Sequence, residues 1–197
     1  MRRLLTIPWL FYPVAVIVAA LLIAGGLRPE WPAPHYPTIA ASRLGPTFVL
    51  HAEALANVQA GNQNYTYVDT DEQGVPIGVR IARRSDTLAQ AAQGALFALS
   101  PGDVAALAGK PCTLEIFYRP LPITTAASIS VKWDGSPNFV QVPIEPREGL
   151  VRLELPAGDI GAGLRIAPES DLADYHYGME LVEVRITPGV AAPIGTQ

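Results

Sequence analysis

The sequence predicts an all-β domain, an antiparallel β-sandwich with one short helix, preceded by a single N-terminal transmembrane helix. Apolar and polar residues alternate with a period of two in most segments after residue 46. Turn signals such as Asp134-Gly135-Ser136-Pro137 and Glu148-Gly149 recur about every ten residues, the spacing of a sandwich. A long uncharged run near the N-terminus predicts the membrane helix.

Residues 4–27 lie between Arg3 and Arg28 and contain no charged side chain. A helix rising ~1.5 Å per residue over this run is long enough to cross about 30 Å of hydrocarbon. Because Arg2 and Arg3 favour a cytoplasmic N-terminus, we expect a single-pass membrane protein whose C-terminal domain is periplasmic or extracellular. A cleaved signal peptide is the alternative, since small residues at 24–26 suit a signal peptidase.

The segment after the anchor is rich in proline, which prevents a helix and favours an extended spacer. Its prolines are Pro29, Pro32, Pro34, Pro37 and Pro46. The chain therefore divides into four predicted parts. These are the cytoplasmic N-terminus with the anchor (1–28), a Pro-rich linker (29–46), the sandwich domain (47–187) and a disordered tail (188–197).

The predicted strands bury one face and expose the other, as antiparallel sheets do. They are centred on residues 48–50, 79–81, 96–99, 114–118, 129–133, 140–144, 151–155, 164–166 and 182–186. In the last strand, Val182, Val184 and Ile186 form the apolar phase. Residues 85–99 are ambiguous, because Ser85-Asp86-Thr87 also fits the cap of an Ala-rich helix, but the strand reading of 94–99 is favoured.

One short helix has clear boundary signals. Ser100 supplies an N-cap, Pro101 stands at the first helical position, and Asp103 follows three residues after the cap. The helix is expected to run through Val104 to Leu107 and to end at Gly109.

This order of elements between Ala95 and Ile186 resembles a galactose-binding-like jelly roll, the fold of many carbohydrate-binding modules. The resemblance lies in the strand at 96–99, the capped helix, Leu107-Ala108-Gly109-Lys110, a strand ending Phe117-Tyr118-Arg119, a Trp-bearing strand and the closing strand at 180–186. It implies a jelly roll and sugar binding. Family members often hold a structural calcium, but only Glu180 or Glu183 matches its ligands, so no metal or cofactor is assigned.

A short segment near the C-terminus has the residues that a sugar site uses. Aromatic rings stack on the apolar face of a sugar, while carboxylates accept hydrogen bonds from its hydroxyls. The candidate ligand-binding residues are Asp171, Asp174, Tyr175, His176 and Tyr177, with Trp133 as a sixth. The alternative is an acidic surface loop, and Trp133 also fits a core position because it lies in the apolar phase of its strand.

Several functions are excluded. The formal charge of −4 and the lack of a basic patch argue against nucleic acid. Cys112 is the only cysteine, so no intrachain disulfide can form, and we expect it to be buried. There is no Gly-x-Ser-x-Gly, His-Glu-x-x-His or Gly-rich phosphate loop, and the three histidines are scattered. We therefore expect no enzyme activity and no catalytic residue.

Two functions remain open. The first is a membrane-anchored extracytoplasmic binding domain, held in the lipid bilayer by residues 4–27, that recognises an envelope glycan. It predicts exposed aromatic residues. The second is a non-catalytic accessory or structural subunit that docks on a larger membrane or envelope complex. It predicts an exposed apolar patch larger than a few hundred Å², and small-residue pairs such as Ala15–Ala19 would let another helix approach the anchor.

Overall fold

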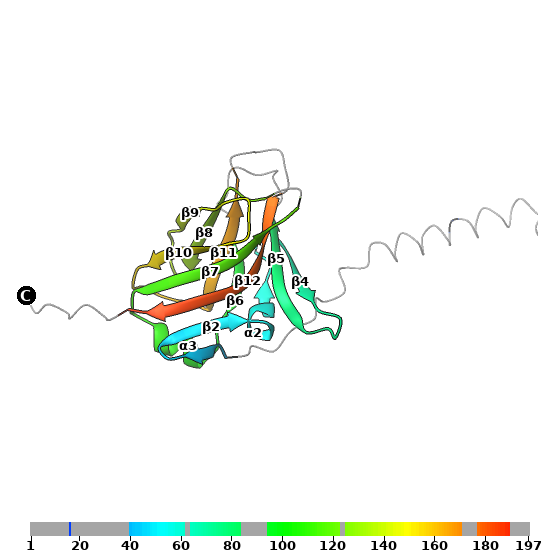
Figure 1. Ribbon diagram of the computed structural model, residues 1–197. Helices are drawn as coiled ribbons and strands as arrows, with labels where there is room; N and C mark the ends of the chain where they lie inside the picture. Colours follow the sequence, from blue (N-terminus) through cyan, green and yellow to red (C-terminus); the bar gives the residue numbers. More distant parts are fainter. Residues whose placement is uncertain are drawn as a thin grey trace, which may run out of the picture. The chain divides into compact units, whose positions relative to one another are not determined.

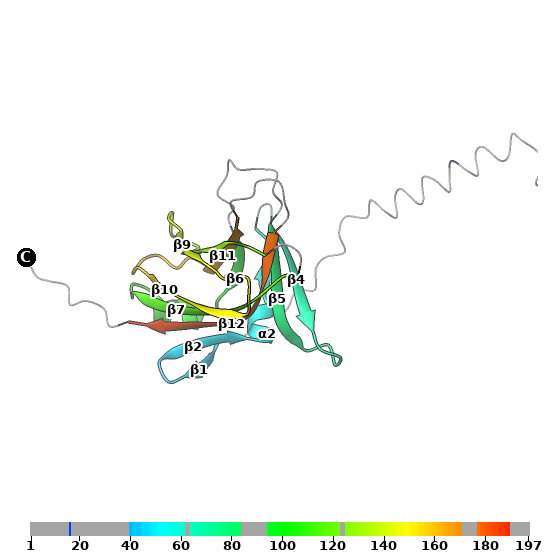
Figure 2. The same ribbon diagram turned by 45° about the horizontal axis from the view of Figure 1, so that its top comes forward.

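The computed structural model describes residues 16, 40–61, 64–83, 94–122, 125–170 and 177–189, with only the backbone of Tyr177. Residues 36–197 belong to one compact unit, and the architecture below is that of this unit. It consists of two antiparallel sheets and two short helices within the described residues (Figure 1), and Figure 2 shows the sheets as separate layers. The prediction of an all-β fold with antiparallel sheets is confirmed.

The larger sheet has seven strands arranged around one long strand. Its members are β1 (Ser42–Leu44), β2 (Thr47–His51), β4 (Asn64–Thr70), β5 (Pro76–Arg83), β7 (Cys112–Pro120), β10 (Gly149–Leu155) and β12 (Tyr177–Pro188). On one side β12 pairs with β7 over most of its length, and β7 pairs with β10. On the other side the first half of β12 pairs with β5 and the second half with β2. The β4–β5 and β1–β2 pairs therefore lie end to end along β12.

The smaller sheet has five strands in the order β3-β6-β11-β8-β9. Their bounds are β3 (Val58–Gln59), β6 (Ala95–Ala98), β8 (Ser128–Trp133), β9 (Val140–Pro143) and β11 (Gly163–Glu169). Side chains from the inner faces of both sheets form one core, in which Trp133, Phe48 and Phe97 are the largest fully buried residues. Each of the strands that the period-two alternation predicted is present.

The closing strand differs from its predicted phase. The register of β12 against β7 shifts between Leu181 and Glu183, which is a β-bulge. Met179 and Leu181 are buried before the bulge, and Val184 and Ile186 after it, whereas Val182 is only half-buried. The prediction that Val182 shares the apolar phase is wrong, because the extra residue at the bulge moves the inward positions by one.

Helix α3 (Pro101–Leu107) confirms the predicted capping signals. The backbone N–H of Asp103 donates to Ser100 Oγ at 3.2 Å, and Gly109 after the helix has a φ of 70°. A second helix, α2 (Glu53–Ala56), was not expected. The prediction of one helix is therefore wrong, since a single turn is too short to give a helical period in the sequence.

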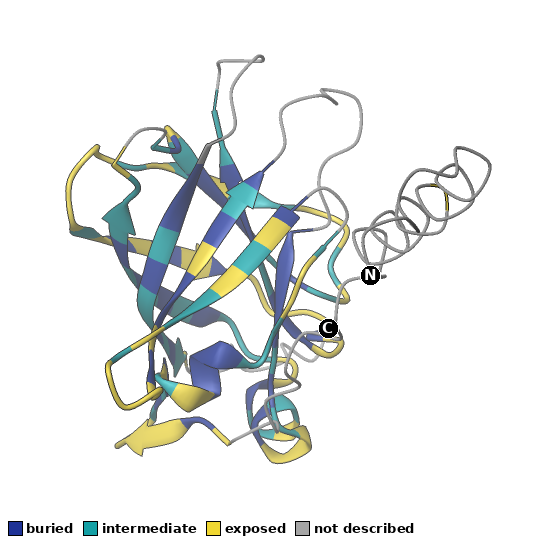
Figure 3. Ribbon diagram, turned by 90° about the vertical axis from the view of Figure 1, so that its right-hand side faces the viewer, coloured by how far each residue is buried: buried dark blue, intermediate teal, exposed yellow. Residues whose placement is uncertain are grey.

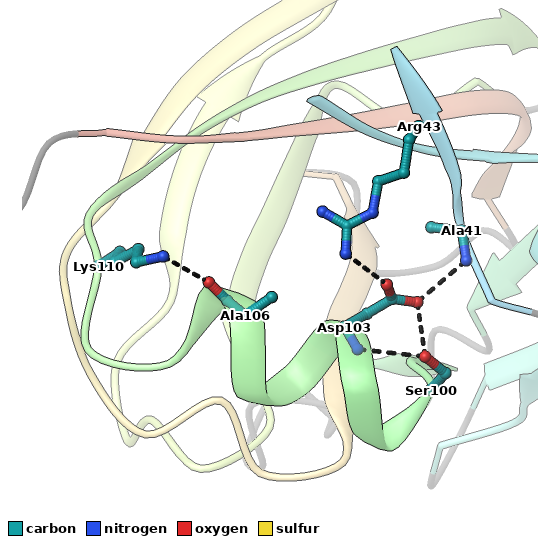
Figure 4. Close-up of polar contacts among 6 residues, drawn as sticks. All are labelled: Ala41, Arg43, Ser100, Asp103, Ala106 and Lys110. Atoms are coloured by element: carbon teal, nitrogen blue, oxygen red, sulfur yellow. Dashed lines mark hydrogen bonds and ion pairs between the residues drawn. The ribbon is translucent and has the colours of Figure 1, made fainter. Parts of the chain in front are cut away.

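The folded region begins earlier than the predicted boundary at residue 47. Asp103 is 3% exposed and accepts hydrogen bonds from the Ala41 backbone N–H at 3.0 Å and from Ser100 Oγ at 2.7 Å (Figure 4). Its other carboxylate oxygen meets Arg43 Nη2 at 3.3 Å. Residues 42–44, expected in the linker, instead form β1. A buried carboxylate on α3 thus ties the start of the domain to the helix.

The remaining predicted parts lie largely outside the described residues. These are the membrane segment 4–27 apart from Val16, the linker up to residue 39 and the tail from residue 190. Among the residues that the structure does describe, no helix has both the length and the apolar character needed to cross a bilayer.

Candidate functional site

The predicted ligand-binding residues fall into three groups. Asp171, Asp174, Tyr175 and His176 lie outside the described residues. Tyr177 is the first residue of β12, where its backbone is opposite Arg83 of β5. Trp133 is 1% exposed and belongs to the core between the sheets, as its strand phase also indicated. Because its ring is enclosed by other core side chains, Trp133 does not line a surface site in this structure.

The outer face of the larger sheet carries two exposed tyrosines near the start of β12. Tyr65 and Tyr67, on β4, are 56% and 64% exposed. Residues i and i+2 of a strand share a face, so both rings lie on the same side of the sheet. Along β4 the exposed Tyr65 and Tyr67 alternate with the half-buried Thr66 and Val68, whereas on β5 exposed and half-buried residues stand between buried ones (Figure 3). Neither tyrosine is among the site residues predicted from the sequence. The available signal was aromatic residues in the polar phase of Asn64-Tyr65-Thr66-Tyr67-Val68.

A row of polar side chains crosses the sheet from Tyr67. Tyr67 on β4 pairs with Arg80 on β5. Arg80 pairs in turn with Glu180 on β12, and Glu180 pairs on its other side with Arg119 on β7. Neighbouring strands lie about 4.8 Å apart, so the row spans roughly 14 Å. We call Tyr67, Arg80, Glu180 and Arg119 the polar row. It offers guanidinium donors and a carboxylate acceptor in a line across four strands.

The charges of the polar row are paired with opposite charges. Arg80 Nη2 lies 2.5 Å from Asp69 Oδ2, and Arg119 Nη1 lies 3.8 Å from Glu180 Oε1. Glu180 extends over Gly78 of β5, where a Cβ atom would be only 2.7 Å from Glu180 Oε1. Glycine at position 78 therefore leaves room for the Glu180 carboxylate over β5.

The row beside it is formed by small residues. Tyr65 is opposite Ala82, and Ala82 is opposite Gly178. Ala82 is half-buried, so on β5 only a methyl group borders Tyr65. Gly178 is buried, and a Cβ atom added there would lie 2.9 Å from Leu121 Cδ1. Tyr65, Tyr67 and Ala82 together form what we call the tyrosine shelf.

Two titratable groups near the site and in the core have shifted pKa values. Burial raises the pKa of Glu169, the last residue of β11, although its partner Arg83 opposes the shift. This ion pair links the two sheets where the segment 171–176 begins and ends. Burial also raises the pKa of the Cys112 thiol to about 11. Cys112 is buried at the start of β7, as predicted, and its thiol stays protonated at neutral pH.

The described residues contain no group of three or more His, Cys, Asp or Glu side chains that is arranged to hold a metal ion. The two carboxylates that matched the family calcium site are both engaged by arginines. Glu180 meets Arg119, and Glu183 accepts a hydrogen bond from Arg185 Nε at 2.5 Å.

No protein-family model and no curated protein matches the chain. Among solved structures, the chain is similar to a GH26-CBM35 β-(1,4)-mannanase from Podospora anserina, with 14% sequence identity and a TM-score of 0.26. The likeness covers 70% of this chain but only 28% of the mannanase chain. A TM-score this low does not establish a shared fold. The two-sheet architecture is defined by the strand pairing alone.

Proposed function

We propose that this chain is a membrane-anchored binding module, of jelly-roll type, whose larger sheet recognises a glycan outside the cytoplasm. One observation carries the proposal. Tyr65 and Tyr67 are both more than half exposed and lie on the same face of the edge strand β4. Tyr67 is also the first residue of the polar row. In this proposal residues 4–27 hold the module in the bilayer, and the module has no catalytic activity.

The tyrosine shelf has the chemistry that sugars require. A tyrosine ring has an apolar face that stacks on the C–H groups of a pyranose, and a hydroxyl that stays hydrated at its other end. Arg80 and Glu180 supply donors and an acceptor for sugar hydroxyls. Their existing ion pairs hold these side chains in place before a ligand arrives, which reduces the entropy lost on binding.

The predicted segment 171–177 is part of the proposed site. Tyr177 enters β12 opposite Arg83, and Arg83 is opposite Asn64, the neighbour of Tyr65. The chain therefore leaves this segment one register position from the tyrosine shelf. We propose that Asp171, Asp174, Tyr175 and His176 add acceptors and rings to the same site.

An accessory subunit that docks on a larger complex is the second candidate function. It is favoured by β4, which pairs only with β5 among the described strands and so has a free edge. Such an edge accepts a strand from another chain. In that case Tyr65 and Tyr67 would be covered by protein and not by sugar.

The direct test is glycan binding by the full chain in detergent micelles. We would measure retention in native gels that contain soluble glucan, mannan, galactan, xylan or chitin oligosaccharides. The Tyr65→Ala/Tyr67→Ala variant should weaken binding about 10-fold or more, because two aromatic contacts are lost. Leu44→Ala is the matched control, since Leu44 is equally exposed on β1 of the same sheet. Full retention of the double variant would refute the tyrosine shelf as the site.

A further inference from the structure

The outer face of the larger sheet also holds a groove of about 400 Å³ over β10, β7 and β12. One apolar side chain from each strand lines it: Leu150, Phe117 and Val182. Glu148, Glu183 and Arg185 supply most of the polar lining, and Gly149 and the buried Tyr118 complete it. Leu150 is 50% exposed, so the groove is open to solvent.

The bulge in β12 shapes this groove. Because the register shifts between Leu181 and Glu183, Val182 leaves the core phase and lines the groove instead. On its far side, the Arg185 guanidinium lies 4.7 Å from the centroid of the Phe117 ring and is held by Glu183. The groove thus has apolar surface from all three strands, with a fixed cation at one wall.

The polar row leads into the groove. Arg119, its last residue, lies 3.6 Å from Glu148 through its Nε atom, and Glu148 is part of the groove lining. Phe117 is two residues from Arg119 along β7 and faces the same side. From Tyr67 to Phe117 the path crosses three strand spacings and two residues, roughly 16 Å. This distance is longer than one sugar ring and suits a chain of several.

The charges along this path favour a neutral ligand. Three arginines line it: Arg80, Arg119 and Arg185. Four carboxylates accompany them, those of Asp69, Glu148, Glu180 and Glu183, and each arginine forms an ion pair with at least one. A polyanionic glycan would meet more carboxylates than guanidiniums. A neutral sugar needs only the hydrogen-bonding capacity that these side chains retain.

We infer that the tyrosine shelf, the polar row and the groove form one continuous site for a neutral oligosaccharide of several sugar units. One end of the oligosaccharide stacks on Tyr65 and Tyr67, and the other end occupies the groove over Phe117. The inference rests on the proposed function and adds to it a specificity for chain length.

The test is calorimetry of the full chain in detergent micelles with glucose, mannose, galactose or N-acetylglucosamine oligomers of two to six units. The affinity should rise with chain length. Phe117→Ala should weaken hexamer binding about 3- to 10-fold, the value of one aromatic contact. Leu150→Arg should give the same result by filling the groove from an exposed position, which protects the test against misfolding of Phe117→Ala. Leu44→Ala is the control for both.

The outcomes separate the two proposals. Hexamer binding that is unchanged in both groove variants but lost in Tyr65→Ala/Tyr67→Ala overturns the continuous site and leaves the proposed function intact. Equal affinity of the wild type for dimer and hexamer does the same. Failure of the wild type to bind any of these oligomers overturns both proposals.

Discussion

Removing the Asp103 carboxylate should destabilise the domain more than any other single polar change at its N-terminal edge. Asp103 is buried and accepts hydrogen bonds from the Ala41 backbone N–H and from Ser100 Oγ. In Asp103→Ala, the Ala41 N–H loses its acceptor, which costs about 1–3 kcal/mol. The Arg43 ion pair adds at most about 1 kcal/mol, since its guanidinium is half exposed. We expect a total loss of about 1–4 kcal/mol.

For a domain of this size, that loss lowers the melting temperature by roughly 2–15 °C. Thermal unfolding of the full chain, followed by circular dichroism at fixed detergent, measures it. Lys110→Ala is the matched control, because Lys110 Nζ donates to Ala106 O on the same helix without crossing to β1 (Figure 4). It should cost no more than about 0.5 kcal/mol. Hydrogen exchange at the Ala41 amide should accelerate only in Asp103→Ala. Equal melting temperatures for the two variants would refute the reasoning.

Two further predictions concern Asp134 and Cys112. Burial opposes ionisation of Asp134, but bonds from the Ala162 N–H and Arg165 lower its pKa below the ordinary 3.8. Asp134→Asn should therefore be less stable than wild type at pH 7, and urea titrations should show the deficit shrinking as the pH falls below 3.8. With a pKa near 11, Cys112 should resist iodoacetamide at pH 8 until denaturant is added, which mass spectrometry detects. Rapid labelling of the folded protein would contradict its burial.

Local patterns in the sequence were sufficient to predict most elements of the fold. The alternation of Leu114 and Ile116 with Thr113 and Glu115 specifies β7, and Ser100 with Pro101 specifies the start of α3. Such signals lie within a few residues of the element they define. Helix α2 and strand β1 are too short to show a period. Each is stabilised by distant contacts, as β1 is by Asp103, which is 60 residues away along the chain.

The candidate site was harder to predict because it depends on strand register. Tyr67, Arg80, Glu180 and Arg119 are far apart in sequence and become neighbours only through the pairing of four strands. For Trp133 the sequence predicted a site residue where the structure has a core residue. A tryptophan in a predicted binding fold suggested a ligand contact, but its place in the apolar phase of β8 decided its burial.

The bulge in β12 connects the core to the proposed site. Leu181 and Val184 are both buried, although three residues apart, and a regular strand would turn one of them to solvent. The extra residue resolves this conflict by keeping both in the core, and it leaves Val182 outside the core, where it lines the groove together with Phe117 and Leu150. Before the bulge, the outward positions of β12 are Gly178, which is buried, and Glu180, which belongs to the polar row. After it, the outward positions are Glu183 and Arg185, which close the groove. One inserted residue thus keeps the core continuous along the strand and gives its outer face two different halves. In the inferred site, the first half contributes to the polar row and the second half to the groove.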